Sequence, residues 1–251
     1  MGQSVITEPF GGVLSRRARG LSMIGAASLA LVGIAVSAAA PSAAMPATGR
    51  IEGVVHLVAS NEPAIASGAY PTRRVSRPSP RTSEIANVIV FLKNPPRQAT
   101  LAAARASMMQ ADESFSPRVV AITRGSTVEF PNSDPFFHNV FSLSRGATFD
   151  LGRYPRGQSR ARVFSQAGLV KVYCHLHSHM SASIMVFDHP YFTMPSAQGT
   201  FVIDNVPPGE HRVSAWHERI GESPKDIRVE PGGTVRVEFS LPVELQSLTR
   251  P

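Results

Sequence analysis

Short runs of apolar and β-branched residues, separated by turn residues, recur along most of this sequence and constrain its fold more than any other feature. Among them are NVIVFLK, STVEFPN, GLVKVYC, SASIMVFD, GTFVID and TVRVEFSL. Each run has the length of a strand and is too short for a typical helix. The breaks between runs draw on 21 Pro and 19 Gly. The pattern predicts an all-β protein built of β-sandwiches, in which only residues 99–106 are expected to form a short helical stretch.

The chain contains a single cysteine, Cys174. One cysteine excludes an intrachain disulfide framework and any chemistry that needs a pair of cysteines. What remains is a thiol with a function of its own, or a buried thiol that packs as a small apolar residue. The stretch around it, YCHLHSHM, also holds three of the eight histidines and a methionine, which favours a metal-binding thiol.

The first 44 residues have the features of a secretory signal peptide. Three arginines (Arg16, Arg17 and Arg19) precede an uncharged run that begins at Leu21, and Ser42-Ala43-Ala44 fits a small-x-small cleavage site. An uncleaved membrane anchor is the alternative. No later run is apolar enough to cross a bilayer, so we expect an exported protein with no membrane span after cleavage, which in a bacterium means the periplasm.

The chain stays basic without this segment. Removal of residues 1–44 takes Lys+Arg from 25 to 22 and Asp+Glu from 18 to 17, which leaves a net charge of +5. No nucleic-acid-binding motif accompanies the positive charge, and we expect no nucleic-acid partner. An acidic protein partner fits an exported basic protein better.

Four residues have the types and the order that a type 1 copper site needs. Such a site uses two imidazoles and one thiolate in a plane, with a weak axial thioether. His138 lies in FPNSDPFFHNVFS, and Cys174 ends the run GLVKVYC. Candidate His and Met ligands follow before the run SASIMVFD.

From Phe115 to Asp188 the chain resembles the cupredoxins, through FxN…HNV, a Gly-initiated strand ending in YC, and a ligand loop. A plastocyanin-like loop spacing would place the axial Met at Ala182, and an azurin-like spacing would place it at Ser183, so neither fits. The amicyanin-like spacing, Cys-x-x-His-x-x-Met, selects His177 and Met180. The resemblance implies a Greek-key sandwich over 104–188 and one type 1 copper per chain, held by His138, Cys174, His177 and Met180.

The neighbours of these residues have expected roles as well. The resemblance implies that the Asn139 side chain ties the two ligand loops together. Tyr173 should point to the surface, where it is a possible electron route to the thiolate. His175 and His179 are either exposed bystanders or accessory metal ligands. Because Tyr173 stands where copper oxidases and nitrite reductases have a His, we expect no second, catalytic copper, and an electron-transfer protein rather than an enzyme.

The C-terminal part resembles the transthyretin-like, carboxypeptidase regulatory-like sandwich. Its marks are Gly199-x-Phe201-x-Ile203, Pro207-x-Gly209 and the strand into Ala215-Trp216. The first half of such a domain is expected upstream, at Gly53–Val55 and Asn87–Leu92. We therefore expect a sandwich formed by 49–98 and 189–247, with the cupredoxin inserted into it. The alternative is a tandem in which the early strands complete the cupredoxin sheet.

Together these features predict a periplasmic blue copper protein that passes single electrons between redox partners, such as a dehydrogenase or a c-type cytochrome. The whole chain resembles exported cupredoxins described as methylamine utilisation proteins. A copper chaperone or storage protein that uses His175 and His179 is one alternative. A non-redox binding module based on the second sandwich is another.

Overall fold

The computed structural model describes residues 47–60, 84–96 and 101–244. Nearly all regular structure in these residues is β, as the sequence predicts, with one short 3-10 helix, η1 (Glu84–Asn87). The expected signal peptide, residues 1–44, lies outside the described residues. The part of the chain that the structure describes contains no helix of the length and hydrophobicity needed to span a bilayer.

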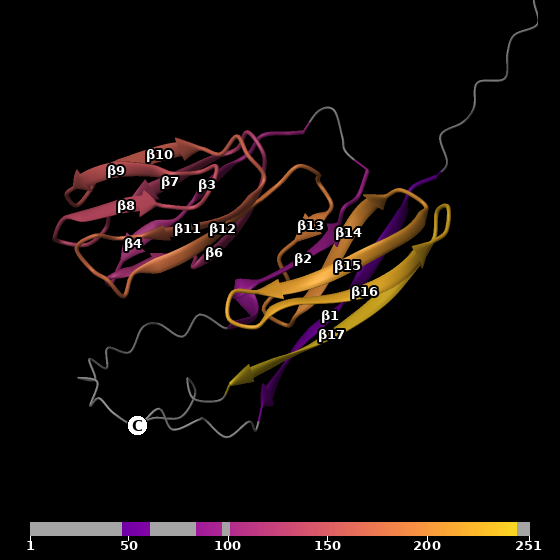
Figure 1. The fold of residues 1–251 in the computed structure, drawn as a ribbon. Coiled ribbons are helices and arrows are strands. Elements are labelled where there is room, and N and C mark those ends of the chain that lie inside the picture. The colour runs from indigo at the N-terminus through magenta and orange to yellow at the C-terminus, as the bar shows by residue number, and fades with distance from the viewer. Residues whose placement is uncertain (1–46, 61–83, 97–100, 245–251) are drawn as a thin grey trace, which may run out of the picture. The chain divides into compact units, whose positions relative to one another are not determined.

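The central part of the chain folds into one β-sandwich (Figure 1). A five-stranded sheet has the order β6-β12-β11-β8-β9, and a three-stranded sheet has the order β10-β7-β3. A hairpin, β4-β5, completes it. The bounds are β3 (Arg105–Ser107), β4 (Met109–Ala111), β5 (Ser114–Ser116), β6 (Val119–Thr123), β7 (Thr127–Pro131), β8 (His138–Ser142), β9 (Phe149–Tyr154), β10 (Ser159–Val163), β11 (Gly168–Tyr173) and β12 (Ser181–Phe187). This sandwich occupies the segment in which the sequence resembles the cupredoxins, and we call it cupredoxin-like because of that resemblance.

Alternation of side chains builds the core between these two sheets. In β7, Val128 and Phe130 are buried, while the alternate residues Thr127, Glu129 and Pro131 are only partly buried. In β11, Val170 and Val172 face the same core. The core also contains Cys174 and Met180, which follow β11 and precede β12. The candidate ligand loop therefore starts and ends inside the hydrophobic core of the sandwich.

The helix expected at residues 99–106 is wrong over its described part, 101–106, while residues 99–100 lie outside the described residues. Residues 101–104 are not helical, and Arg105–Ser107 forms β3, which pairs in parallel with β7. The Ala104 carbonyl accepts a hydrogen bond from the Thr127 amide at 2.9 Å. Pairing with a neighbouring strand thus overrides the helical propensity of this alanine-rich stretch.

A second sandwich joins the two ends of the described chain. One sheet has the order β14-β1-β17 and the other has the order β13-β2-β15-β16 (Figure 1). The bounds are β1 (Gly49–Ser60), β2 (Val88–Lys93), β13 (Phe192–Thr193), β14 (Thr200–Val206), β15 (Gly209–His217), β16 (Gly221–Val229) and β17 (Thr234–Glu244). β1 runs parallel to β17 and antiparallel to β14, and β2 pairs with β15. Strands that precede the cupredoxin-like segment therefore pair in the same sheets with strands that follow it. Two expectations stay predictions: the domain boundaries at 49–98, 104–188 and 189–247, and membership of the carboxypeptidase regulatory-like family.

An apolar cluster lies where residues of the two sandwiches meet. Ile89 and Trp216 belong to β2 and β15, while Val119 and Phe187 belong to β6 and β12, and all four are buried in one cluster. Beside it, the Glu218 carboxylate pairs with Arg118 and, at 3.3 Å, with Lys171. Trp216 and Glu218 therefore have a structural role.

Candidate metal centre

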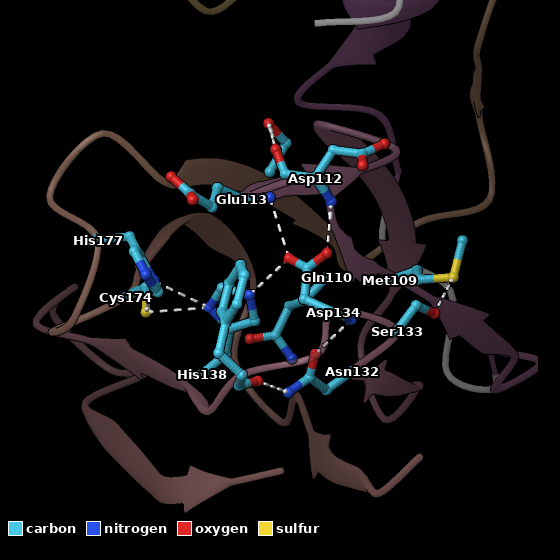
Figure 2. Close-up of polar contacts among 12 residues, drawn as sticks. Met109, Gln110, Asp112, Glu113, Asn132, Ser133, Asp134, His138, Cys174 and His177 are labelled. Carbon is cyan, nitrogen blue, oxygen red and sulfur yellow. Dashed lines mark hydrogen bonds and ion pairs between the residues drawn. The ribbon is translucent and has the colours of Figure 1, made fainter. Parts of the chain in front are cut away.

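The ends of two neighbouring strands bring three potential ligands together. β8 begins at His138, and β11, which runs antiparallel beside it, ends just before Cys174. His177 lies three residues further along the loop to β12. Cys174 Sγ lies 3.7 Å from His138 Nδ1 and 3.7 Å from His177 Nδ1, and the two Nδ1 atoms are 3.1 Å apart (Figure 2).

The second nitrogen of His138 is held by a buried carboxylate. His138 Nε2 donates a hydrogen bond to Asp134 Oδ2 at 2.7 Å (Figure 2). Asp134 also accepts from the backbone amides of Asp112 and Glu113, at 2.8 and 3.0 Å. Burial raises the pKa of Asp134, but the hydrogen bonds from His138 and from these amides outweigh it, so this pKa lies below its usual range. An ionised Asp134 keeps the proton of His138 on Nε2 and leaves the Nδ1 lone pair free.

Sequence reasoning missed Asp134. It stands four residues before His138 in FPNSDPFFHNVFS, and it is the only acidic residue of that stretch. The spacing alone does not reveal the contact, because the intervening Pro135 to Phe137 form a loop whose path follows from the tertiary structure. Asn132 shapes this loop, since its side chain donates to the carbonyls of Phe136 and Tyr154 at 2.9 and 3.1 Å.

His177 is partly exposed and has the properties of a neutral ligand. Burial lowers its pKa, and the neighbouring His138 lowers it further. Its ring contacts those of His138 and Phe136, with centroids 4.7 and 5.4 Å apart. A neutral imidazole is the protonation state that binds metals.

Met180 lies at the end of the same loop and is 1% exposed. Its amide donates to the His177 carbonyl at 3.0 Å, and its carbonyl accepts from the Cys174 amide at 3.4 Å. These two bonds close the loop into a compact turn with Met180 next to Cys174. Met180 also packs in the hydrophobic core, so its role as an axial ligand stays a prediction.

The Asn139 side chain bridges the two ligand-bearing segments, which is the contact expected for it. Its Oδ1 accepts from the His175 amide at 3.4 Å, and its Nδ2 donates to Asp150 at 2.5 Å. The Gly152 amide also donates to Asp150. Asn139 therefore links β8 and β9 to the loop that follows Cys174.

The two remaining histidines of the loop lie outside the three-ligand cluster. His175 stacks on Phe141, with ring centroids 3.7 Å apart, and its Nε2 lies 3.6 Å from Asp150. His179 Nε2 lies 3.3 Å from Glu113. Both side chains are more than half exposed. Each histidine thus has a carboxylate of its own, and an accessory metal role for either stays a prediction.

Tyr173 lies at the surface, as its place in the strand predicts. It precedes Cys174 and is 37% exposed. Its ring lies against Phe141, with centroids 5.8 Å apart. Tyr173 thus forms part of the surface next to the buried thiol.

Comparison with known proteins found solved structures of low identity and low overall similarity. No protein-family model matches the sequence, and no match was found among curated proteins. A purple cupredoxin from Nitrosopumilus maritimus is 24% identical over 33% of this chain and 99% of its own, with a TM-score of 0.30. A reduced amicyanin variant is 18% identical over 39% of this chain and 98% of its own, with a TM-score of 0.32. A Cu-containing nitrite reductase from Thermus scotoductus SA-01 is 24% identical over 37% of this chain but only 25% of its own, with a TM-score of 0.33.

The cluster itself fits a metal ion. Bonds of about 2.0 Å to nitrogen and about 2.3 Å to sulfur place the donors of a trigonal set about 3.5–3.7 Å apart. The three separations here, 3.1, 3.7 and 3.7 Å, lie close to that spacing. One thiol with two imidazoles is a donor set of mixed softness, which suits copper and zinc and does not suit magnesium or calcium.

Proposed function

We propose that this chain is a type 1 copper protein that transfers single electrons. The observation that supports this most directly is the convergence of His138 Nδ1, Cys174 Sγ and His177 Nδ1 on one point at the end of a cupredoxin-like sheet. These three residues, together with Met180 from the same loop, would hold the ion. A copper ion bound there would supply one-electron chemistry by alternating between Cu(I) and Cu(II).

The protein around the site keeps the ligands in place. His138 and Cys174 are buried, and Asp134 fixes the ring orientation of His138. The two backbone bonds of Met180 hold the loop that carries His177. A rigid ligand set favours electron transfer, because little has to move when the charge of the site changes.

The surface next to His177 supplies the electron route. Phe136 and Phe137 are 37% and 53% exposed, and Phe136 packs on both histidine rings. Phe136 covers the ligand rings on this side, while His177 itself stays partly exposed. We assign electron entry or exit to the His177 edge, with Tyr173 as a second route through its peptide bond to Cys174.

We propose a carrier rather than an enzyme, because Tyr173 stands where a His could reach a second copper. The site of action we propose is the periplasm, after removal of residues 1–44. The partners of this protein would be redox proteins, such as a dehydrogenase or a c-type cytochrome. We also propose a role of the protein in methylamine utilisation, on the ground of the sequence resemblance described above.

An optical spectrum of the copper-loaded protein tests the assignment. We expect an intense visible band from thiolate-to-copper charge transfer, at one copper per chain, and a reversible one-electron potential. Cys174→Ser should abolish the band, and Met180→Ala should shift the band and the potential. His175→Ala and His179→Ala are the matched controls from the same loop and should leave band and stoichiometry unchanged.

A colourless copper-loaded protein would refute the proposal. If copper binding instead exceeds one ion per chain, depends on His175 and His179, and shows no reversible potential, the protein is a copper chaperone or store.

A further inference from the structure

Four exposed arginines line β9 and β10, along an edge that begins beside the candidate metal centre at Arg153. Arg153 lies on β9, Arg156 in the turn that follows, and Arg160 and Arg162 on β10. We call these four side chains the basic edge. All four are exposed, and the one acidic residue of these two strands, Asp150, accepts a hydrogen bond from Asn139 and lies 3.6 Å from His175.

The basic edge differs from the rest of the described surface because its arginines lack ion-pair partners. Elsewhere, most described cations have a carboxylate partner, as Arg50 has Asp204 and Arg236 has Glu52. None of the four arginines forms an ion pair with a described acidic residue. Their charges therefore add up to a local positive potential.

Two of these arginines also have a structural role. β9 and β10 are the edge strands of the two sheets and lie next to each other (Figure 1). Arg160 lies over the Tyr154 ring and donates to the Leu151 carbonyl at 3.3 Å, and Arg162 lies over the Phe149 ring. They cover the open side of the sandwich, which explains their position. Arg153 and Arg156 have no such contact, so their charge needs another explanation.

The basic edge is continuous with the aromatic rim of the metal site. The turn that carries Arg156 is bonded to Asn132 on both sides, from Gly157 N to Asn132 O at 2.8 Å and from Asn132 N to Gln158 O at 2.9 Å. The Asn132 side chain donates to the Phe136 carbonyl. On β9, Arg153 is the register partner of Asn139.

We propose that the basic edge and the Phe136–Phe137 rim together form the docking surface for an acidic protein that exchanges electrons with the metal site. This inference rests on the proposed function. An exposed apolar centre with a polar and charged border is the pattern of a transient protein interface. Charge complementarity speeds the encounter, and the apolar rim brings the partner to the His177 edge.

Binding of poly-L-glutamate to the metal-free full chain tests the surface without reference to copper. We expect binding that weakens at least tenfold between about 20 and about 200 mM salt. The double variant Arg153→Glu/Arg156→Glu should lose about tenfold or more in affinity at low salt. Lys225→Glu is the control, because Lys225 on β16 is exposed and lies over the Phe239 ring without an ion pair to a described residue.

Reaction of the reduced, copper-loaded protein with hexacyanoferrate(III) tests the position of the surface relative to the site. This anion takes up one electron from the protein and becomes hexacyanoferrate(II). The double variant should react about three- to tenfold more slowly at low ionic strength, and about equally fast near 0.5 M salt. With the cation tris(phenanthroline)cobalt(III), the double variant should react faster than the original protein.

The docking proposal is overturned if the double variant binds polyglutamate like the original protein. It is overturned equally if anionic phosphatidylglycerol vesicles or duplex DNA bind at the edge while polyglutamate does not. Hexacyanoferrate rates that do not respond to the double variant would overturn the link to the metal site. If the copper-loaded protein lacks the visible band, the proposed function is refuted and not the docking surface. Polyglutamate binding to the metal-free chain tests the surface alone, so the two failures can be told apart.

Discussion

His138 uses its two ring nitrogens for different purposes. Nε2 is tied to the buried Asp134, while Nδ1 faces Cys174 and His177. A carboxylate on the far nitrogen of a histidine ligand fixes its tautomer and makes the other nitrogen more basic. Asp134 therefore affects the proposed copper site without contacting the ion.

We predict that Asp134→Asn weakens copper binding by about 10–100-fold. It should also raise the reduction potential, because a less basic His138 stabilises Cu(II) less. A competition titration and voltammetry measure the two effects. Asp112→Asn is the control, since Asp112 contributes only its backbone amide to this network. Unchanged affinity and potential in Asp134→Asn would show that the carboxylate only packs.

At the scale of elements, β1 shows why a glycine stands inside a strand. β1 lies between β14 and β17, and Gly53 faces Val237 on one side and Phe201 on the other. A Cβ at Gly53 would lie 1.7 Å from the Val237 carbonyl oxygen and 2.8 Å from Phe201 Cζ. Close backbone approach, and not a turn, explains this glycine.

We predict that Gly53→Ala destabilises the metal-free protein by about 1–3 kcal/mol, because the added methyl group forces the strands apart. Urea unfolding measures the loss. Val202→Ala on the adjacent β14 is the control, since Val202 is 42% exposed and should matter little. A Gly53→Ala variant as stable as the original protein would contradict the close packing of β1 against β17.

At the scale of the whole molecule, Glu218 connects the two sandwiches. It follows β15 and pairs with Arg118 and Lys171, which flank or belong to strands of the cupredoxin-like sheet. Burial raises the pKa of Glu218, but the Arg118 and Lys171 partners outweigh it, so this pKa lies below its usual value of 4.5. The ionised form is thus the one that stabilises the folded state.

We predict that Glu218→Gln lowers the free energy of unfolding by about 1–2 kcal/mol at neutral pH. This loss is smaller than for a fully buried ion pair, because Arg118 and Lys171 are both partly exposed to solvent. A carboxyl whose pKa is lowered by folding stabilises the protein above its unfolded pKa, and loses that effect as the pH falls through its folded value. The original protein should therefore lose more stability than the variant below about pH 4.5. Thermal unfolding across pH measures this, with Glu238→Gln as control, because Glu238 is exposed and forms no ion pair with a described residue. Parallel pH profiles for the original protein and Glu218→Gln would contradict it.

The sequence by itself determined the features that depend on neighbouring residues. The apolar runs and their turns predict the all-β fold, because alternation and chain breaks act over a few residues. The spacing of the candidate ligands is equally local, since Cys174, His177 and Met180 lie within seven consecutive residues, and their role as ligands stays a prediction. The helical expectation near Arg105 is wrong because strand pairing with distant β7 outweighs local propensity.

Only the tertiary structure decided what meets across long stretches of chain. Neither the contact of Asp134 with the far side of the His138 ring nor the contact of Glu218 with Arg118 follows from spacing. The pairing of β1 with β17 joins segments separated by the whole cupredoxin-like sandwich. The gathering of unpaired arginines at one edge depends in the same way on how β9 and β10 come together. Such contacts are set by packing of complete sheets, because each residue meets its partner only when both sheets have formed.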